Sequence, residues 1–196
     1  SRTLVFAVIA MREVEFFAEA AKRLKADDPA LDICFVSFFQ PGNRRLRELG
    51  FRCFDLYEGL ASQAVPDSAQ IRALERRYGI DNLHRLLIHE KLTQGQYDDD
   101  VLLAKFSTYL ARLDAILEDI RAGRPGQELV VLQELGGFVA PLSLYFAARR
   151  HGATHVFFEP SFFKGRLHYV VNGLGACHPA AVEVPAGTRA AVHAYL

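Results

Sequence analysis

A chain of 196 residues with 51% hydrophobic content can bury the core of one domain, and its 23 Lys and Arg residues balance its 23 Asp and Glu residues. Zero net charge argues against a general nucleic-acid binder, because such proteins carry a basic excess. No apolar run reaches the roughly 20 residues that a membrane-spanning helix needs.

The first 56 residues alternate between strand-like and helix-like segments. Apolar runs rich in β-branched residues at 3–10, 31–39 and 51–56 predict three strands, and the first is apolar throughout, as in strands buried on both faces. Apolar residues at helical spacing predict helices over 12–26 and 41–49. This alternation is typical of an α/β fold with a Rossmann-like, doubly wound, mostly parallel sheet flanked by helices.

The pattern changes around residues 60–97, where we expect a helical insertion. Segments 68–77 and 81–91 have the apolar spacing of short helices, and Asp67 or Ser68 can cap the first. The polar face of the second is basic, with His84, Arg85, His89 and Lys91. It is either a solvated helix face or a contact surface for an anionic acceptor or a lipid headgroup layer.

Residues 98–122 form the longest predicted helix, with apolar residues recurring along one face. Asp98, Asp99 and Asp100 stand at its start, where the helix dipole favours negative charge. Consecutive helical residues point about 100° apart, which is poor geometry for a shared metal ion. We therefore interpret the three aspartates as capping residues.

Two further strands are predicted at 129–132 and 154–158, joined by a helix that stops at Gly152. Glu134 follows the first of these strands and Glu159 follows the second. Ligands of an open parallel sheet bind beyond the carboxyl ends of its strands. We therefore expect both glutamates at the functional edge of the sheet.

Glu134 and the turn Gly136-Gly137 form the best single candidate site. Glycines allow a sharp turn from strand to helix, and the free N–H groups of the new helix can hold an anion. A carboxylate at such a strand end can act as a general base or bind sugar hydroxyls. A helix cap and a tight turn without further function would give the same pattern.

The second candidate is the polar loop predicted at residues 161–173, which is long for a simple connector. Its candidate substrate-binding residues are Ser161, Lys164, Arg166 and Asn172. The two cations can bind a phosphate or carboxylate while aromatic neighbours supply stacking faces. Alternatively, Glu159 pairs with one of these cations and only holds the loop, and Asn172 marks a turn of positive φ.

Several other kinds of site are disfavoured. The first strand is followed by Ala10-Met11-Arg12-Glu13, which has no glycine to let a backbone approach a pyrophosphate. The chain has no phosphate-loop motif and no Gly-x-Ser-x-Gly nucleophile elbow. The seven histidines suggest no metal site, and Cys34, Cys53 and Cys177 show no metal or redox spacing. We interpret the cysteines as small hydrophobes of a protein in the reducing cytoplasm and expect no bound metal.

The order of elements up to Asn172-Gly173 resembles the N-terminal half of bacterial capsule-polysaccharide biosynthesis proteins. The residues that carry this resemblance are the strand ending in Glu134, the strand ending in Glu159 and the loop after it. These proteins are glycosyltransferase-like, of GT-B type, and some transfer Kdo from its CMP donor. One departure is Pro160-Ser161, where the family has a glycine-rich turn.

The resemblance implies two Rossmann-like halves with a cleft between them. The N-terminal half would bind the acceptor, the C-terminal half would bind most of the nucleotide sugar, and the chemistry would need no metal or other cofactor. Glu134 and Glu159 would face the cleft, with Lys164, Arg166 and Asn172 beside it.

The expected function is therefore transfer of a sugar from a nucleotide-sugar donor to a glycan or glycolipid acceptor in surface-polysaccharide synthesis. Glu134 first, and Glu159 second, would act as base or hydroxyl anchor. The protein would be cytoplasmic, and peripheral contact with the inner membrane is a further expectation. Residues 1–185 would form the Rossmann-like N-terminal domain, with a strand at 181–184, and residues 186–196 would begin a linker or helix to a second domain.

Two other classes of function fit the same pattern. One is a non-enzymatic, flavodoxin-like binding or interaction module, whose loop would bind a partner rather than a sugar. The other is a nucleotide-sugar epimerase of related two-domain architecture, which would release free sugar or a new epimer without any acceptor. Product analysis would show the epimerase.

Overall fold

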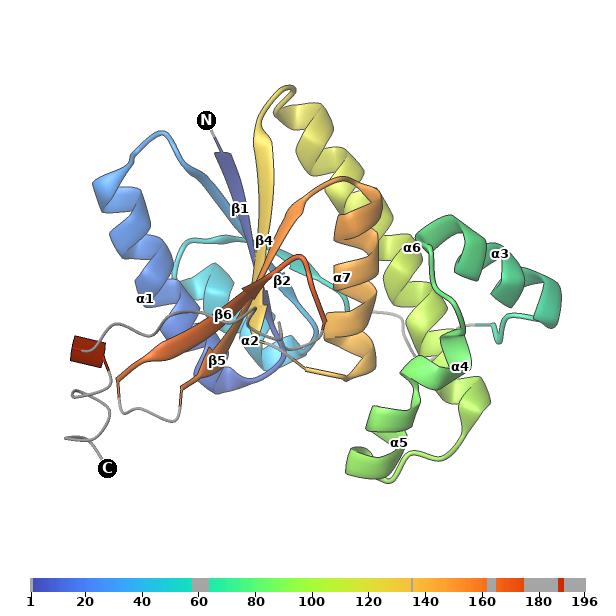
Figure 1. Cartoon of the computed structure of the whole chain (residues 1–196). Helices are drawn as coiled ribbons and strands as arrows, with labels where there is room; N and C mark the ends of the chain where they lie inside the picture. Colours follow the sequence, from blue (N-terminus) through green and yellow to red (C-terminus); the bar gives the residue numbers. More distant parts are fainter. Residues whose placement is uncertain (1, 58–63, 135, 162–164, 175–186, 189–196) are drawn as a thin grey trace.

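The computed structural model describes residues 2–57, 64–134, 136–161, 165–174 and 187–188 (Figure 1). The described helices are α1 (Met11–Asp27), α2 (Gln40–Glu48), α3 (Ser68–Tyr78), α4 (Leu83–Leu86), α5 (Ile88–Gln94), α6 (Asp99–Gly123) and α7 (Val139–Arg150). The described strands are β1 (Arg2–Val8), β2 (Asp32–Ser37), β3 (Arg52–Asp55), β4 (Glu128–Glu134), β5 (Thr154–Pro160) and β6 (Leu167–Val171).

The strands form one six-stranded sheet in the order β3-β2-β1-β4-β5-β6. Neighbours from β3 to β5 are parallel, whereas β6 runs antiparallel to β5. The strand order reverses between β1 and β4, where Phe6 lies opposite Leu132. This reversal is the topological switch point of a Rossmann-like sheet. The predicted α/β, doubly wound and mostly parallel fold is thereby confirmed.

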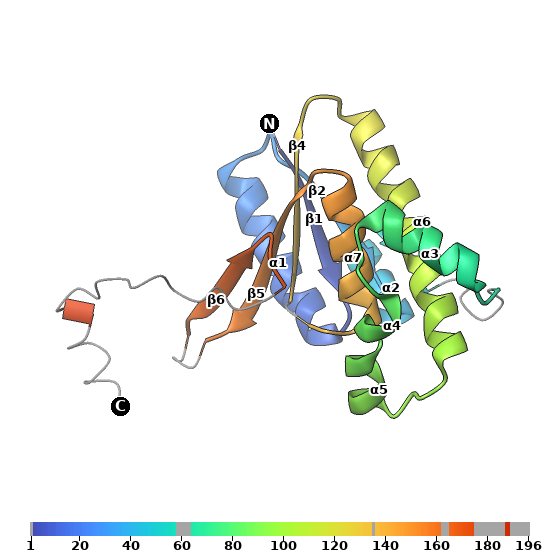
Figure 2. The same cartoon turned by 45° about the vertical axis from the view of Figure 1, so that its right-hand side comes forward.

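Each face of the sheet has its own apolar core, as expected for strands buried on both sides. On one face, α1 and α2 pack on β1 and β2, and Phe6 of β1 contacts both Phe17 of α1 and Phe35 of β2. The opposite face is covered by α6 and α7, so that the sheet lies between two helical layers (Figure 2).

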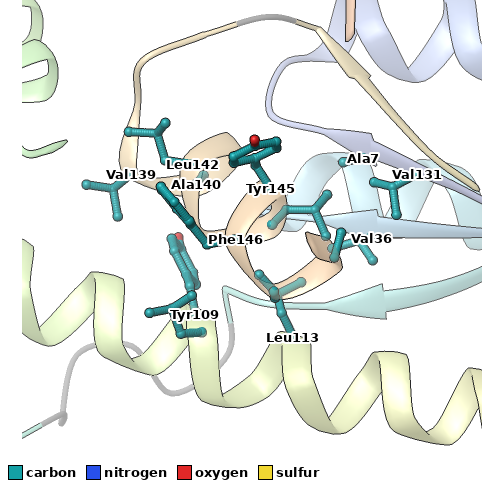
Figure 3. Packing of buried hydrophobic residues seen from close by; sticks show 14 of the residues in the cluster. Ala7, Val36, Tyr109, Leu113, Val131, Val139, Ala140, Leu142, Tyr145 and Phe146 are labelled. Carbon is teal, nitrogen blue, oxygen red and sulfur yellow. The ribbon is translucent and has the colours of Figure 1, made fainter. Parts of the chain in front are cut away.

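The side chains of α7 fill the space between the sheet and α6. Figure 3 shows Tyr145 and Phe146 of α7 in one cluster with Val131 of β4 and with Tyr109 and Leu113 of α6. All five are buried, which explains why the apolar positions of α7 cover most of its circumference.

The predicted insertion is helical in its described part, and α3, α4 and α5 lie on the outer side of α6 and α7 (Figures 1 and 2). The side chain of Asp67 caps α3 by accepting the N–H groups of Ala69 and Gln70, both at 2.8 Å. Leu83 and Leu87 are fully buried and join the core of α6 and α7.

A buried carboxylate ties the insertion to the body of the domain. Asp114 of α6 is only 4% exposed and accepts hydrogen bonds from the Tyr78 hydroxyl at 2.6 Å and from Arg77 at 2.8 Å. Arg150 and His151 each approach the same carboxylate to 3.0 Å. Burial works to raise the pKa of Asp114, but these four partners outweigh it and lower the pKa.

The basic face predicted on 81–91 is largely engaged within the protein. Lys91 forms an ion pair with Asp99, and His84 approaches the same carboxylate to 3.6 Å. The ring of His89 packs edge-on against Phe138, with 4.8 Å between ring centroids. Of the three aspartates interpreted as caps, Asp98 caps α6 through the N–H groups of residues 100 and 101, whereas Asp99 serves as an ion-pair partner.

Three predictions require correction or lie outside the described residues. The prediction of a polar loop at 161–173 is wrong, because Leu167–Val171 form the strand β6, which makes a hairpin with β5. The sequence of this edge strand is mostly apolar or aromatic, but the polar residues on either side of it, Arg166 and Asn172, favour the interpretation as a loop. The single helix expected at 81–91 is two short helices, α4 and α5. Of the segments predicted after residue 180, the structure describes only residues 187 and 188.

Membrane-spanning helices are not found among the described residues, because no helix there is both long and apolar enough to cross a bilayer.

Candidate functional site

Glu13 and Glu134 meet at the switch point of the sheet. β1 ends at Val8 and α1 begins at Met11, which places Glu13 in the first turn of α1. β4, the neighbour of β1, ends at Glu134. Parallel strands present their carboxyl ends at the same edge of a sheet, so two distant segments bring their carboxylates together here.

The carboxylate of Glu13 is held by the turn that precedes its own helix. Glu13 is only 5% exposed. Its Oε2 accepts the backbone N–H groups of Ile9 at 2.5 Å and Ala10 at 3.1 Å. Among the described residues, no donor group reaches its buried Oε1. The carboxyl group of Glu13 lies against that of Glu134, and the two share a hydrogen bond.

Glu134 is held by Arg12, the residue before Glu13. One Arg12 nitrogen, Nη2, donates to both oxygens of the Glu134 carboxylate, at 2.7 and 2.8 Å. The Arg12 side chain is 75% exposed and that of Glu134 only 22%, so this ion pair lies at the rim of the site. It fixes the orientation of Glu134 without removing it from solvent.

The two carboxyl groups titrate as a pair. Burial and the hydrogen bond to Glu134 raise the pKa of Glu13 to about 8, against an opposing effect of the Ile9 and Ala10 N–H groups. Burial also works to raise the pKa of Glu134, but the hydrogen bond to Glu13 and the ion pair with Arg12 outweigh it and lower the pKa. Near neutral pH the pair therefore holds one proton, mainly on Glu13.

This pair opens into a pocket of about 230 Å³, which we call the Glu134 pocket. Its polar lining residues are Arg12, Glu13, Glu134 and Glu159, and its apolar ones are Phe16, Phe17, Phe158, Pro160 and Leu167. The two glutamates predicted from strand ends thus line one pocket. Apolar and aromatic walls with a few convergent polar groups are typical of small-molecule sites.

The start of α7 is occupied by a carboxylate of the protein itself. Glu90 of α5 is 5% exposed, accepts the N–H of Val139 at 2.7 Å and forms a 2.6 Å ion pair with Lys105 of α6. The first N–H of this helix, which we expected to be free for a substrate anion, therefore holds Glu90.

Gly136 and Gly137 have a packing role in this turn. Neither glycine has a positive φ angle, so neither position needs the backbone freedom of glycine. A Cβ atom on Gly137 would lie 2.8 Å from the ring of His89, whereas one on Gly136 would meet its neighbours at 3.6 Å. Gly137 thus permits the close approach of α5 to the β4–α7 turn, and neither glycine lines the Glu134 pocket.

The hairpin between β5 and β6 holds the other candidate residues, and Lys164 lies outside the described residues. The N–H of Ser161 donates to the backbone carbonyl of Arg166 at 3.0 Å, which closes the hairpin beside the Glu134 pocket. The side chain of Arg166 is exposed. Within the described ranges no ion pair joins Arg166 to Glu159.

Asn172 does not lie beside Glu134 and Glu159, contrary to the expectation from the family resemblance. Its side-chain oxygen accepts the N–H of His155, and its own N–H donates to the His155 carbonyl, both at 2.8 Å. His155 lies at the start of β5, the end of the strand opposite to Glu159. The φ angle of Asn172 is +55°, so the predicted turn of positive φ is confirmed.

Metal ligands do not cluster in the described part of the chain, where no group of three or more His, Cys, Asp or Glu side chains could hold a metal ion. Cys34 and Cys53 are buried and free, as small hydrophobes are expected to be, and Cys177 lies outside the described residues.

Glu13 is a site residue that reasoning from the sequence missed. The turn after β1 lacks the glycines of a dinucleotide site, and that criterion takes no account of the charged residues Arg12 and Glu13. A signal was present, because Glu13 follows the end of β1 by a few residues and so lies at the same edge of the sheet as Glu134 and Glu159.

The fold and its site define the class of protein as a Rossmann-like α/β domain with a carboxyl pair at its switch point. Comparison of the chain with models of protein families, with curated proteins and with solved structures gave no match.

Proposed function

We propose that this chain is the acceptor-binding, N-terminal domain of a GT-B-type glycosyltransferase for bacterial capsule or other surface polysaccharide. The enzyme would transfer a sugar from a nucleotide-sugar donor to a glycan or glycolipid acceptor. It would be cytoplasmic, with peripheral contact at the inner membrane.

One observation carries this proposal: carboxylates of the protein itself occupy both helix starts at the switch point. Glu13 accepts the N–H groups before α1, and Glu90 accepts the first N–H of α7. In Rossmann-like folds such N–H groups bind the phosphates of a nucleotide. A domain that fills both positions with carboxylates is suited to a hydroxyl-bearing acceptor, while the phosphates of the donor bind elsewhere.

The carboxyl pair supplies the proton transfer that this reaction needs. The acceptor hydroxyl gives its proton to the pair as its oxygen forms a bond to the anomeric carbon of the donor. The bond from that carbon to the phosphate oxygen breaks, and its electron pair leaves with the nucleotide. The proton that the pair holds near neutral pH lies mainly on Glu13, so the ionised carboxylate that takes the acceptor's proton would be Glu134, which Arg12 orients. Glu159 lines the same pocket and would anchor a hydroxyl.

The decisive experiment offers the full-length gene product a panel of nucleotide sugars with glycan acceptors and identifies the products by mass spectrometry. Acceptor-dependent transfer supports the proposal. Free sugar or a new epimer formed without acceptor would indicate an epimerase, and an inert protein that binds neither sugar nor nucleotide would indicate an interaction module.

Two substitutions then test the pair. Glu134→Gln should lower kcat by at least about 100-fold, because general-base catalysis contributes about that much, whereas Glu13→Gln imitates the protonated carboxyl and should have a smaller effect. Glu19→Gln is the matched control, since this exposed glutamate of α1 lies outside the pocket. Near-normal turnover of Glu134→Gln would remove the pair from catalysis.

A further inference from the structure

A second cavity, of about 430 Å³, lies at the same edge of the sheet, and we call it the α6-side cavity. Its lining includes Ile9 and Phe38, which follow β1 and β2, and Phe138, which precedes α7. The insertion and α6 close its other side with Gln96 and Lys105. It therefore lies beyond the carboxyl ends of the strands, where ligands of such sheets bind.

The charges of this cavity cancel. Its charged lining residues are Glu90 and Lys105, and they form a 2.6 Å ion pair. The Glu90 carboxylate also accepts the Val139 N–H, so neither this helix start nor the lysine is left to attract an anion. A phosphate or carboxylate would have to break this arrangement, whereas an uncharged ligand would not.

The remaining lining suits a sugar ring. The rings of Phe38 and Tyr109 meet at 80° with 5.0 Å between centroids, so they provide apolar walls but no parallel faces to sandwich a flat base. Gln94 and Gln96 add side-chain amides, which both donate and accept hydrogen bonds. Apolar walls match the C–H faces of a sugar, and amides match its hydroxyls.

The turn between β1 and α1 separates this cavity from the Glu134 pocket. Ile9 lines the α6-side cavity, while Arg12 and Glu13, a few residues later, line the Glu134 pocket. A glycan bound in both would cross this turn. We infer that the α6-side cavity binds a second, uncharged sugar ring, so that the acceptor is a chain of at least two sugars. The acceptor role of this glycan rests on the proposed function, whereas the neutral sugar site does not.

A steric block tests this inference. Val101 of α6 is 47% exposed and lines the cavity, so Val101→Trp should fill the cavity without disturbing the core. Ala111→Trp is the matched control, because Ala111 is an exposed residue of the same helix that does not line the cavity.

The probes are the neutral disaccharides maltose, lactose, cellobiose and N,N′-diacetylchitobiose, with uridine as the flat-base comparison. At millimolar concentrations, at least one disaccharide should shift the amide NMR signals of Gln96, Val101 and Phe138 in the chain and its Ala111→Trp variant. Val101→Trp should remove these shifts. Shifts with uridine alone, shifts that survive Val101→Trp, or no shifts with any disaccharide would overturn the inference.

A transfer assay separates this inference from the proposed function. With the full-length enzyme, Val101→Trp should raise KM for a disaccharide acceptor by about tenfold or more, as expected for losing one or two good hydrogen bonds, with kcat little changed. An unchanged KM in active enzyme overturns the second sugar site and leaves the transferase. Disaccharide binding in the cavity of a protein without any transfer activity leaves the sugar site and overturns the transferase.

Discussion

The carboxylate of Glu90, on the inserted helix α5, accepts a 2.7 Å hydrogen bond from the N–H of Val139 at the start of α7. The insertion thereby completes the main domain, because this helix start would otherwise expose an unpaired N–H at the edge of the sheet. In the turn before α1, the carboxylate of Glu13 likewise accepts two backbone N–H groups. Carboxylates of the protein itself thus accept N–H groups at two helix starts where a phosphate could otherwise bind.

Replacing Glu90 should destabilise the fold. Glu90→Ala removes a charge-assisted bond to Val139 and leaves Lys105 without its partner, so the free energy of unfolding should fall by about 2–3 kcal/mol. Glu19→Ala, at an exposed i,i+4 pair with Arg23, should cost less than about 0.5 kcal/mol. Urea denaturation measures both. Equal losses in the two variants would mean that Glu90 does not anchor α7.

The two adjacent glycines of the β4–α7 turn should respond differently to alanine. Gly137→Ala places a Cβ 2.8 Å from the His89 ring and must push α5 away, which should cost about 1–3 kcal/mol. Gly136→Ala meets only ordinary contacts at 3.6 Å and should change stability by less than about 1 kcal/mol. Thermal unfolding compares them, and a Gly136 variant as unstable as the Gly137 variant would contradict this packing.

The buried carboxylate of Asp114 should matter far more than an exposed one. Asp114→Asn leaves Arg77 and Arg150 without their anion, and because both are partly solvated we expect a loss of about 1–3 kcal/mol. Asp119→Asn disrupts the exposed pair with Arg52 and should cost less than about 1 kcal/mol. Denaturant titrations that gave the same midpoint for both variants would show that the insertion is held by apolar contacts alone.

The raised pKa of Glu13 predicts a pH dependence of stability. The folded protein binds this proton up to about pH 8, whereas the unfolded chain releases it near the ordinary glutamate pKa of 4.5. The folded state therefore holds more protons between these values, and stability falls as pH rises through this window, by at most about 1.4 kcal/mol per pH unit. Glu13→Gln should remove this loss. The free energy of unfolding of the variant should therefore rise relative to that of the native protein between about pH 5 and about pH 8.

Comparing Glu13→Gln with the native protein also controls for other groups that titrate in this range. The buried His155, whose pKa burial lowers to about 3, gives the opposite slope below 6.5, where the unfolded chain takes up the proton first. It is present in both proteins, so its effect cancels in the difference. A difference between Glu13→Gln and the native protein that stays constant with pH would show that Glu13 is ionised in the fold.

Local pattern in the sequence determined most of the elements. The apolar runs of β1, β2 and β4 and the helical spacing of α1 and α6 are properties of neighbouring residues, so they could be read without knowing the fold. The alternation of these segments was enough for the doubly wound class and for Glu134 at a strand end. The edge strand β6 escaped because it is only five residues long and is flanked by the polar residues Arg166 and Asn172, which favoured a loop.

Tertiary structure alone decided which residues meet. Arg12 and Glu134 are 122 positions apart and touch because β1 and β4 are neighbours at the switch point, which brings Glu13 against Glu134. Glu90 and Val139 are 49 positions apart and meet because α5 folds back onto the start of α7. Periodicity records which side of an element is buried, but not which element covers it. The carboxyl pair and the closed helix starts therefore follow from the packing of the chain.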